Sequence, residues 1–215
     1  MSDHLPVDPA LVTRMAAVSS PAVTLRALPL RLLLSVRARG GACARVAAVL
    51  GVEALPRHGP MLVSPVGRVT WLRPDEWLVE AALAADALAA DALAADALAA
   101  DALAADARAT DALVIALSEA VGDGTPNADG AVVVLSASRH TLELSGARAR
   151  DVLAAVCTLD LHPRTFPVGH ATQTLLSRAP VLLQLVDATP TWRLLVRPSF
   201  VSYVVEWLAD AMEGA

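Results

Sequence analysis

Three neighbouring side chains could form a nucleophilic site: Cys157, Asp160 and His162. A thiol attacks as its thiolate, and an adjacent imidazole favours that form, so a cysteine and a histidine are the minimum for such chemistry. The two groups must also meet in space, which closeness in the sequence does not ensure. Cys157 follows the apolar face of a predicted helix, a position that small buried residues commonly occupy. The spacing therefore favours a structural cysteine over a cysteine hydrolase.

Other catalytic and metal-binding patterns are missing from the sequence. No two histidines stand four residues apart, as on a zinc-binding helix; they are His4, His58, His140, His162 and His170. The segment Gly122-Asp123-Gly124 has neither the preceding strand nor the following helix of a dinucleotide-binding turn. The chain contains no lysine, which excludes a Schiff-base amine and a P-loop lysine. We therefore expect no catalytic, cofactor-binding or metal-binding residue in this chain.

The composition is typical of a globular protein. The 215 residues fit one domain or two small halves, and a hydrophobic content of 55% excludes intrinsic disorder. No run of about eighteen apolar residues occurs, so we expect no membrane partner. The net charge of −5 comes entirely from the segment Ala81 to Ala112, which holds six aspartates and one arginine. The neutral remainder offers no basic face for nucleic acid. Two cysteines and a start without a signal-peptide pattern predict a cytoplasmic protein.

A low-complexity repeat occupies the middle of the chain. The pentapeptide DALAA occurs four times in register between Asp86 and Ala105. Alanine and leucine favour helix, which predicts one long helix or insertion over 81–121, closed by Gly122. Five residues advance a helix by about 500°, so the leucines spiral around it instead of forming one apolar stripe. This pattern favours an insertion that projects into solvent over an arm that docks on another protein.

Alternation of apolar residues and turn signals predict the elements before the repeat. Residues 1–20 form a weakly ordered lead with a short helix at Ala10–Val18, and Pro29 divides the stretch Val23–Arg37 into two strands. The other expected elements are a helix at Gly40–Leu50, strands at Met61–Ser64, Val66–Leu72 and Trp77–Glu80, and a turn at Pro74-Asp75.

After the repeat, the pattern of strands followed by a helix occurs again. A loop at 122–130 precedes a buried strand at Ala131–Leu135, with Thr141–Leu144 as its neighbour, and Ser145-Gly146 caps a helix at Ala147–Val156. The other expected elements are strands at Thr172–Ser177, Val181–Val186 and Thr191–Val196, and a helix at Ser199–Met212 that buries Phe200, Tyr203, Val204 and Trp207. The repetition predicts an α+β protein of two similar layers, in halves at about 21–80 and 131–215.

Four spaced motifs resemble the gamma subunit of heterotetrameric sarcosine oxidase. They are the hairpin WLRPDEWLV at 71–79, the helix start SGARARDVL at 145–153, the loop LDLHPRTFP at 159–167 and the closing YVVEWL at 203–208. The resemblance covers the chain from about residue 20 to 210, the repeat excepted. This family is distantly similar to the glycine-cleavage aminomethyltransferase and other folate-binding-domain proteins.

The resemblance implies a fold and a role. The fold is a pair of swapped α/β subdomains with antiparallel sheets within 21–215. The role is that of an accessory subunit, not catalytic by itself, in a complex that oxidises sarcosine to glycine with formation of peroxide and methylene-tetrahydrofolate. FAD, FMN, NAD and tetrahydrofolate are then expected in partner subunits. The expected partners are the alpha, beta and delta subunits, with alpha in direct contact. The alternative is a stand-alone folate-binding or aminomethyltransferase-like protein.

Departures from the family pattern bear on that alternative. Arg73 stands where the family's hairpin usually has glycine. In the aminomethyltransferase relatives an acid follows the strand that corresponds to Trp192–Val196, whereas this chain has no Asp or Glu between Asp187 and Glu206. The missing carboxylate favours a structural subunit over a folate-dependent transferase.

Two of the motifs supply a candidate subunit interface. We expect Trp77 in the core, because a large rigid ring beside a tight turn is suited to burial. A loop that mixes charge, imidazole and an aromatic ring is typical of a partner contact, and its alternative is a solvated loop with Phe166 turned into the core. The candidate interface residues are Trp71, Arg73, Asp75, Asp160, His162, Arg164 and Phe166.

Overall fold

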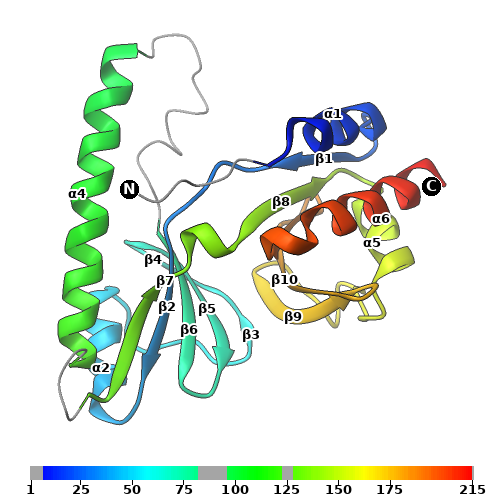
Figure 1. Ribbon diagram of the computed structural model, residues 1–215. Helices are drawn as coiled ribbons and strands as arrows, with labels where there is room; N and C mark the ends of the chain where they lie inside the picture. The colour runs from blue at the N-terminus through cyan, green and yellow to red at the C-terminus, as the bar shows by residue number, and fades with distance from the viewer. Residues whose placement is uncertain (1–6, 82–95, 123–127, 215) are drawn as a thin grey trace. The chain divides into compact units, whose positions relative to one another are not determined.

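The computed structural model describes residues 7–81, 96–122 and 128–214, the side chains of 96–107 excepted. Contacts divide the chain into two compact units, one formed by Met1–Leu30 with Ala137–Ala215 and the other by Arg31–Ser136. Each unit has an antiparallel sheet with helices packed against it (Figure 1). The predicted mixture of helices with two antiparallel sheets is confirmed. Residues 82–95, where the repeat begins, lie outside the described residues.

The first unit is built on a sheet whose strands follow the order β1-β8-β11-β10-β9, with every neighbouring pair antiparallel. Its helices and strands are α1 (Pro9–Val18), β1 (Thr24–Ala27), β8 (His140–Ser145), α5 (Ala149–Val156), β9 (His170–Leu176), β10 (Ala179–Asp187), β11 (Thr191–Val196), η2 (Pro198–Phe200) and α6 (Val201–Glu213). The 3-10 turn η1 (Ser136–Ser138) spans the point in the sequence where the second unit ends and the first resumes. Alternate strand residues and the three helices share one core, so the helices cover one face of this sheet.

Helix α5 shows why the sequence folds this way. Its buried residues are Ala149, Val152, Leu153 and Val156, which follow the three- and four-residue spacing of one helix face. The predicted apolar face is therefore confirmed. Helix α1 is also packed, because Met15 is buried and Arg14 forms ion pairs with α6. The described part of the predicted loose lead is thus part of the unit.

The second unit has the strand order β4-β5-β6-β2-β7. Its elements are β2 (Leu33–Ala38), α2 (Gly41–Val49), the two-residue β3 (Gly59–Pro60), β4 (Leu62–Ser64), β5 (Gly67–Arg73), β6 (Glu76–Ala81), α4 (Asp96–Val121) and β7 (Gly130–Val134). Helix α2 and the end of α4 pack against the sheet through Val46, Leu117 and Val121. Gly122 follows α4 with a φ of 68°, as expected for a glycine that ends a helix.

The placement of three strands corrects the sequence analysis. Strand β7 is a strand as predicted, but it is not buried: Val133 and Val134 are 51% and 56% exposed at an edge of the sheet. Its neighbour is β2, whereas the predicted neighbour β8 pairs with β1 and β11 in the other unit. Strand β1 pairs with β8 in the first unit, and β7 pairs with β2 in the second unit. Each predicted half therefore contributes one edge strand to the other unit. Alternation indicates a strand but does not show its partner.

The other corrections concern the ends of predicted helices and the buried face of α6. Ser145 ends β8 and its hydroxyl contacts Thr24, so Ser145-Gly146 does not cap α5. Ala81 ends β6 and is not part of a helix. In α6 the buried face consists of Val201, Val204, Val205, Leu208, Ala209 and Met212. Phe200 and Tyr203 are half-buried, and Trp207 is 43% exposed, so of the four predicted residues only Val204 is fully buried.

Candidate functional site

The turn between β5 and β6 holds a carboxylate shared by two arginines. Asp75 Oδ2 accepts hydrogen bonds from Arg39 Nε at 2.9 Å, Arg39 Nη2 at 2.7 Å and Arg37 Nη2 at 3.1 Å. The Asp75 carbonyl also accepts the backbone N–H of Ala38 at 3.0 Å. These hydrogen bonds, the one from Arg39 foremost, hold the pKa of Asp75 below its ordinary value of 3.8. The carboxylate is therefore ionised at neutral pH and fixes the turn to the end of β2.

A second carboxylate at the same hairpin orients Arg73. The exposed Arg73 guanidinium has its Nη2 2.7 Å from Glu76 Oε2. Glu76 is buried, and its Oε1 accepts the Ser35 hydroxyl at 2.7 Å. The hairpin end therefore carries three arginines and two carboxylates, and its charged groups are held by one another.

The two tryptophans that flank this turn have different environments. Trp77 is buried and its indole Nε1 donates to the Pro56 carbonyl at 2.8 Å, which confirms the predicted core position. Trp71 is half-buried, and its ring meets His58 edge to face with 5.3 Å between centroids. Trp71 thus packs against the edge of the core of the second unit and is not fully covered.

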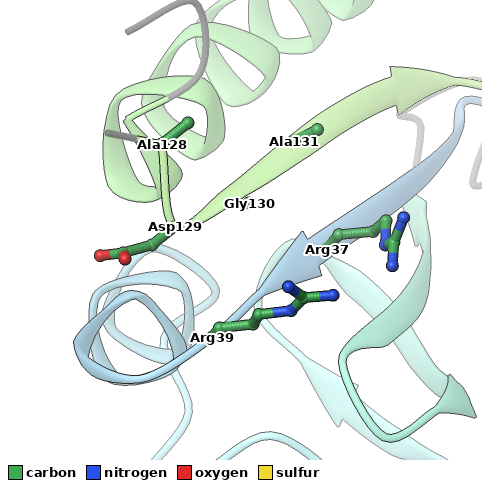
Figure 2. Close-up of a pocket in the computed structure, with 6 residues that line it drawn as sticks. All are labelled: Arg37, Arg39, Ala128, Asp129, Gly130 and Ala131. Atoms are coloured by element: carbon green, nitrogen blue, oxygen red, sulfur yellow. The ribbon is translucent and has the colours of Figure 1, made fainter. Parts of the chain in front are cut away.

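Beside the hairpin lies an open hollow of about 220 Å³, which we call the arginine hollow. It is lined by Arg37, Arg39, Ala128, Asp129, Gly130 and Ala131 (Figure 2). The Arg37 and Arg39 side chains are 51% and 71% exposed. Asp129 points away from both guanidinium groups in Figure 2 and pairs with Arg45 Nη2 at 3.2 Å. Among the described residues that line the hollow, the charged groups without a partner of their own outside the cluster are therefore the two guanidinium groups.

The loop at 160–166 is organised by Asp160. Asp160 Oδ1 accepts the His162 backbone N–H at 2.9 Å, and Oδ2 accepts the Thr165 hydroxyl at 2.8 Å. These two hydrogen bonds, the backbone one first, lower the pKa of Asp160 below 3.8. His162 Nδ1 accepts the Arg164 N–H at 3.2 Å, and both side chains are exposed. Three of the predicted residues thus form one polar surface loop.

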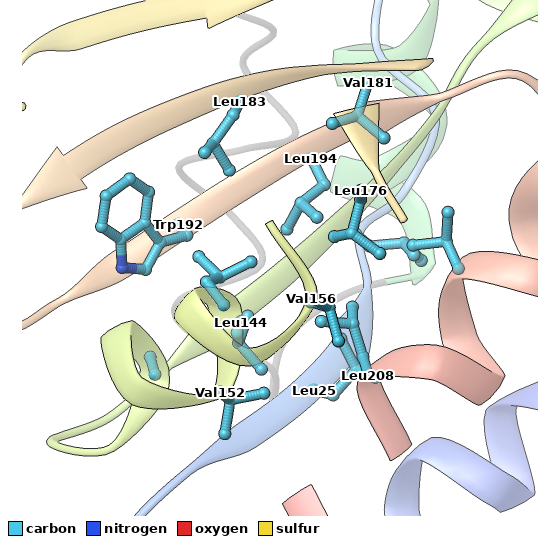
Figure 3. Close-up of a cluster of buried hydrophobic side chains, with 14 of the residues drawn as sticks. Leu25, Leu144, Val152, Val156, Leu176, Val181, Leu183, Trp192, Leu194 and Leu208 are labelled. Carbon is cyan, nitrogen blue, oxygen red and sulfur yellow. The ribbon is translucent and has the colours of Figure 1, made fainter. Parts of the chain in front are cut away.

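Phe166 differs from the rest of this loop. It is buried, and its ring lies 5.2 Å from that of Trp192 between centroids. Trp192 itself is fully buried in the apolar cluster of the first unit (Figure 3). The alternative interpretation of this loop, with Phe166 turned into the core, is therefore the observed one, and Phe166 is not a surface residue.

The geometry does not support a cysteine nucleophile. Cys157 is buried, and its Sγ lies 3.8 Å from the Thr174 hydroxyl. The imidazole of His162 is exposed, with Nδ1 on the Arg164 N–H. The thiol and the imidazole are thus held by different partners, as the structural interpretation of Cys157 predicts.

Two charged groups in the structure were not predicted from the sequence. Arg37 and Arg39 could have been found, because residues two apart at the end of a strand point to the same side. The other group is buried Glu143, which meets Arg26 from β1 and Arg193 Nε from β11 at 3.3 Å. The alternating segment Thr141–Leu144 shows a polar position at 143, but its cationic neighbours come from strand pairing that the sequence does not reveal.

Among the described residues, no group of three or more His, Cys, Asp or Glu side chains is placed to hold a metal ion. No helix in the described ranges combines the length and apolar character needed to cross a membrane.

Comparison with known proteins places the chain. Residues 89–214 match the model of the sarcosine oxidase, gamma subunit family. The sarcosine oxidase subunit gamma of Corynebacterium sp. (strain U-96) is 36% identical over 194 residues, covering 89% of this chain and 80% of the relative. The subunit gamma of Arthrobacter sp. has the same identity and coverage.

Solved structures of the same family and of a more distant protein resemble this chain in fold. A chain of the heterotetrameric sarcosine oxidase from Corynebacterium sp. U-96, solved with pyrrole 2-carboxylate, has a TM-score of 0.73 at 34% identity and covers 95% of this chain and 92% of that chain. Aminomethyltransferase T of the glycine cleavage system from Bartonella henselae has a TM-score of 0.57 at 14% identity, over 92% of this chain and 48% of that chain, which shows a shared fold. By sequence and fold together, this chain belongs to the sarcosine oxidase gamma subunit family.

Proposed function

We propose that this chain is a non-catalytic accessory subunit of a heterotetrameric sarcosine oxidase. The observation that carries the proposal is the match, over 95% of the chain, to a chain of the heterotetrameric enzyme. Curated relatives at 36% identity carry the name sarcosine oxidase subunit gamma. The complex would oxidise sarcosine to glycine, forming peroxide and methylene-tetrahydrofolate.

In this proposal the chemistry belongs to the partner subunits. FAD, FMN, NAD and tetrahydrofolate bind there, and the partners are the alpha, beta and delta subunits in the cytoplasm. The polar side chains of the two candidate surfaces support this division, because they are engaged with one another in turns and loops. Asp75 is bound by two arginines and Asp160 by the backbone and hydroxyl of its own loop. Charged groups that are bound in this way hold a surface turn or loop in place and do not position a substrate.

We further propose that the chain packs against the alpha subunit. The contact residues would be Trp71, Arg73 and Asp75 on one unit and Asp160, His162 and Arg164 on the other. A half-buried aromatic ring beside charged side chains held by their own neighbours is typical of residues that contribute to subunit contacts. Phe166 would support its loop from the core.

A tagged purification from the native lysate tests the proposal. Flavin absorbance in the eluate, larger chains identified by mass spectrometry and sarcosine-dependent peroxide formation would support it. A colourless protein without larger chains would contradict it. Titration of the isolated chain with tetrahydrofolate tests the alternative, because saturable binding there would favour a stand-alone folate-binding protein.

A further inference from the structure

The arginine hollow has more hydrogen-bond donors than its own carboxylate uses. Each guanidinium carries five N–H donors. Asp75 takes one from Arg37 and two from Arg39, all on a single oxygen, Oδ2. Both arginine side chains are more than half exposed, whereas that of Asp75 is 24% exposed. Asp75 thus holds the two cations together, and donors remain for another acceptor.

The charge of the hollow favours an anion. Asp129 is engaged by Arg45, and Glu76 by Arg73, so each of these pairs is neutral. The two arginines and Asp75 leave one net positive charge, although the whole chain carries −5. Two adjacent guanidinium groups can donate to both oxygens of a carboxylate, and they recognise it better than a point charge such as an ammonium group does.

The size of the hollow limits its occupant. Its volume of about 220 Å³ is below the roughly 300–1,000 Å³ of sites that enclose cofactors and other small molecules. The lining residues Ala128, Gly130 and Ala131 are small, and both arginine side chains are more than half exposed. A single acidic side chain fits this space, and the open side admits one from another protein.

We infer that the arginine hollow binds a carboxylate side chain from an acidic segment of a partner subunit, through Arg37 and Arg39. This inference rests on the proposed function, because it specifies a contact in the proposed complex. The arginines lie at the end of β2 and meet the β5–β6 turn through Asp75. The proposed contact at Trp71, Arg73 and Asp75 would therefore also include the end of β2.

Variants in the purified complex test the inference. Replacing both arginines (Arg37→Ala with Arg39→Ala) should weaken assembly at least about tenfold and reduce its dependence on salt, because charge-assisted hydrogen bonds are lost. Asp75→Asn removes the ion pairs within the cluster but keeps both guanidinium groups, so it should weaken assembly less than the double arginine variant does. Arg148→Ala is the matched control, since Arg148 forms an exposed ion pair with Asp151 at 3.5 Å in the other unit. Equal weakening by the arginine and Asp75 variants would mean that the cluster only stabilises the hairpin, and would overturn the inference.

A titration of the isolated full-length chain separates this inference from the proposed function. The Arg37 and Arg39 Nε–H signals, followed by nuclear magnetic resonance, should shift with a tetraglutamate peptide at lower concentrations than with sodium acetate or inorganic phosphate. Equal response to phosphate would indicate a site for free small anions, and no response would indicate no site; either result overturns the inference. If the wild-type chain copurifies with no larger subunits, the proposed function fails. This titration alone then decides whether the arginine hollow binds a carboxylate.

Discussion

Trp77 illustrates how one residue couples the hairpin to the core of the second unit. Its ring packs in the apolar cluster there, while its Nε1 donates to Pro56 at 2.8 Å. Removing the ring leaves both a cavity and an unpaired carbonyl. Trp77→Ala should therefore lower the free energy of unfolding by about 3–5 kcal/mol, as measured by chemical denaturation.

The matched variant for this position is Trp77→Phe, which keeps most of the apolar area but loses the donor. It should lower the free energy of unfolding by about 0.5–1.5 kcal/mol, the net contribution of a typical intramolecular hydrogen bond, because the acceptor carbonyl of Pro56 is only half-buried. If the phenylalanine variant were as unstable as the alanine variant, packing would not be the main contribution of the ring.

The half-buried His140 is expected to make the stability of the protein depend on pH. Burial lowers the pKa of its imidazole from the ordinary 6.5. As the pH falls below 6.5, the unfolded chain binds a proton before the folded chain does, so the free energy of unfolding decreases. His140→Gln should flatten this decrease between about pH 7 and 5 in denaturation curves recorded at several pH values. An unchanged slope in the variant would assign the pH dependence to other groups.

At the scale of elements, the register of β7 against β2 depends on a missing side chain. A Cβ added at Gly130 would lie 1.8 Å from the Arg37 carbonyl oxygen, a backbone atom that cannot give way without moving the strand. Gly130→Ala should lower the free energy of unfolding by at least about 1–3 kcal/mol. It should also displace the amide resonances of β2 and β7.

Gly41→Ala is the control for this substitution. A Cβ at Gly41 meets only the flexible Arg45 side chain, at 3.4 Å, and the residue lies in α2. That variant should be unchanged or more stable by about 0.4–1 kcal/mol, because alanine restricts the unfolded chain. Similar losses in both variants would show that the close approach at Gly130 does not determine the register.

The elements predicted correctly from the sequence are those that a local residue pattern determines. The apolar spacing of Ala149 to Val156 and the turn at Pro74-Asp75 are confirmed, since both follow from nearby residues. Strand partners were not predictable: β7 was expected beside β8 and lies beside β2. In the candidate site, Asp75 was identified from its motif. Its arginines come from a strand about 36 residues away in sequence, and only the fold brings them together.

At the scale of the whole molecule, the DALAA repeat is expected to be dispensable. Its five-residue period spreads the leucines around a helix, so no single face is available for docking. Deleting Asp86–Ala105 keeps the end of α4, which packs through Leu117 and Val121. The shortened chain should assemble with its partners as the full chain does, by size-exclusion chromatography. Leu117→Asp, which disrupts that packing, is the contrasting variant, and loss of assembly on deletion would contradict the spacer interpretation.

In the proposed function, this chain acts as a subunit of a larger flavoprotein. The most direct test is light scattering of the natively purified chain after size exclusion, with absorbance recorded across the visible range. We predict one species much heavier than the 22.3 kDa chain, containing larger chains in fixed ratio and flavin absorbance that sarcosine bleaches without oxygen. A colourless species at the mass of the single chain would contradict the account.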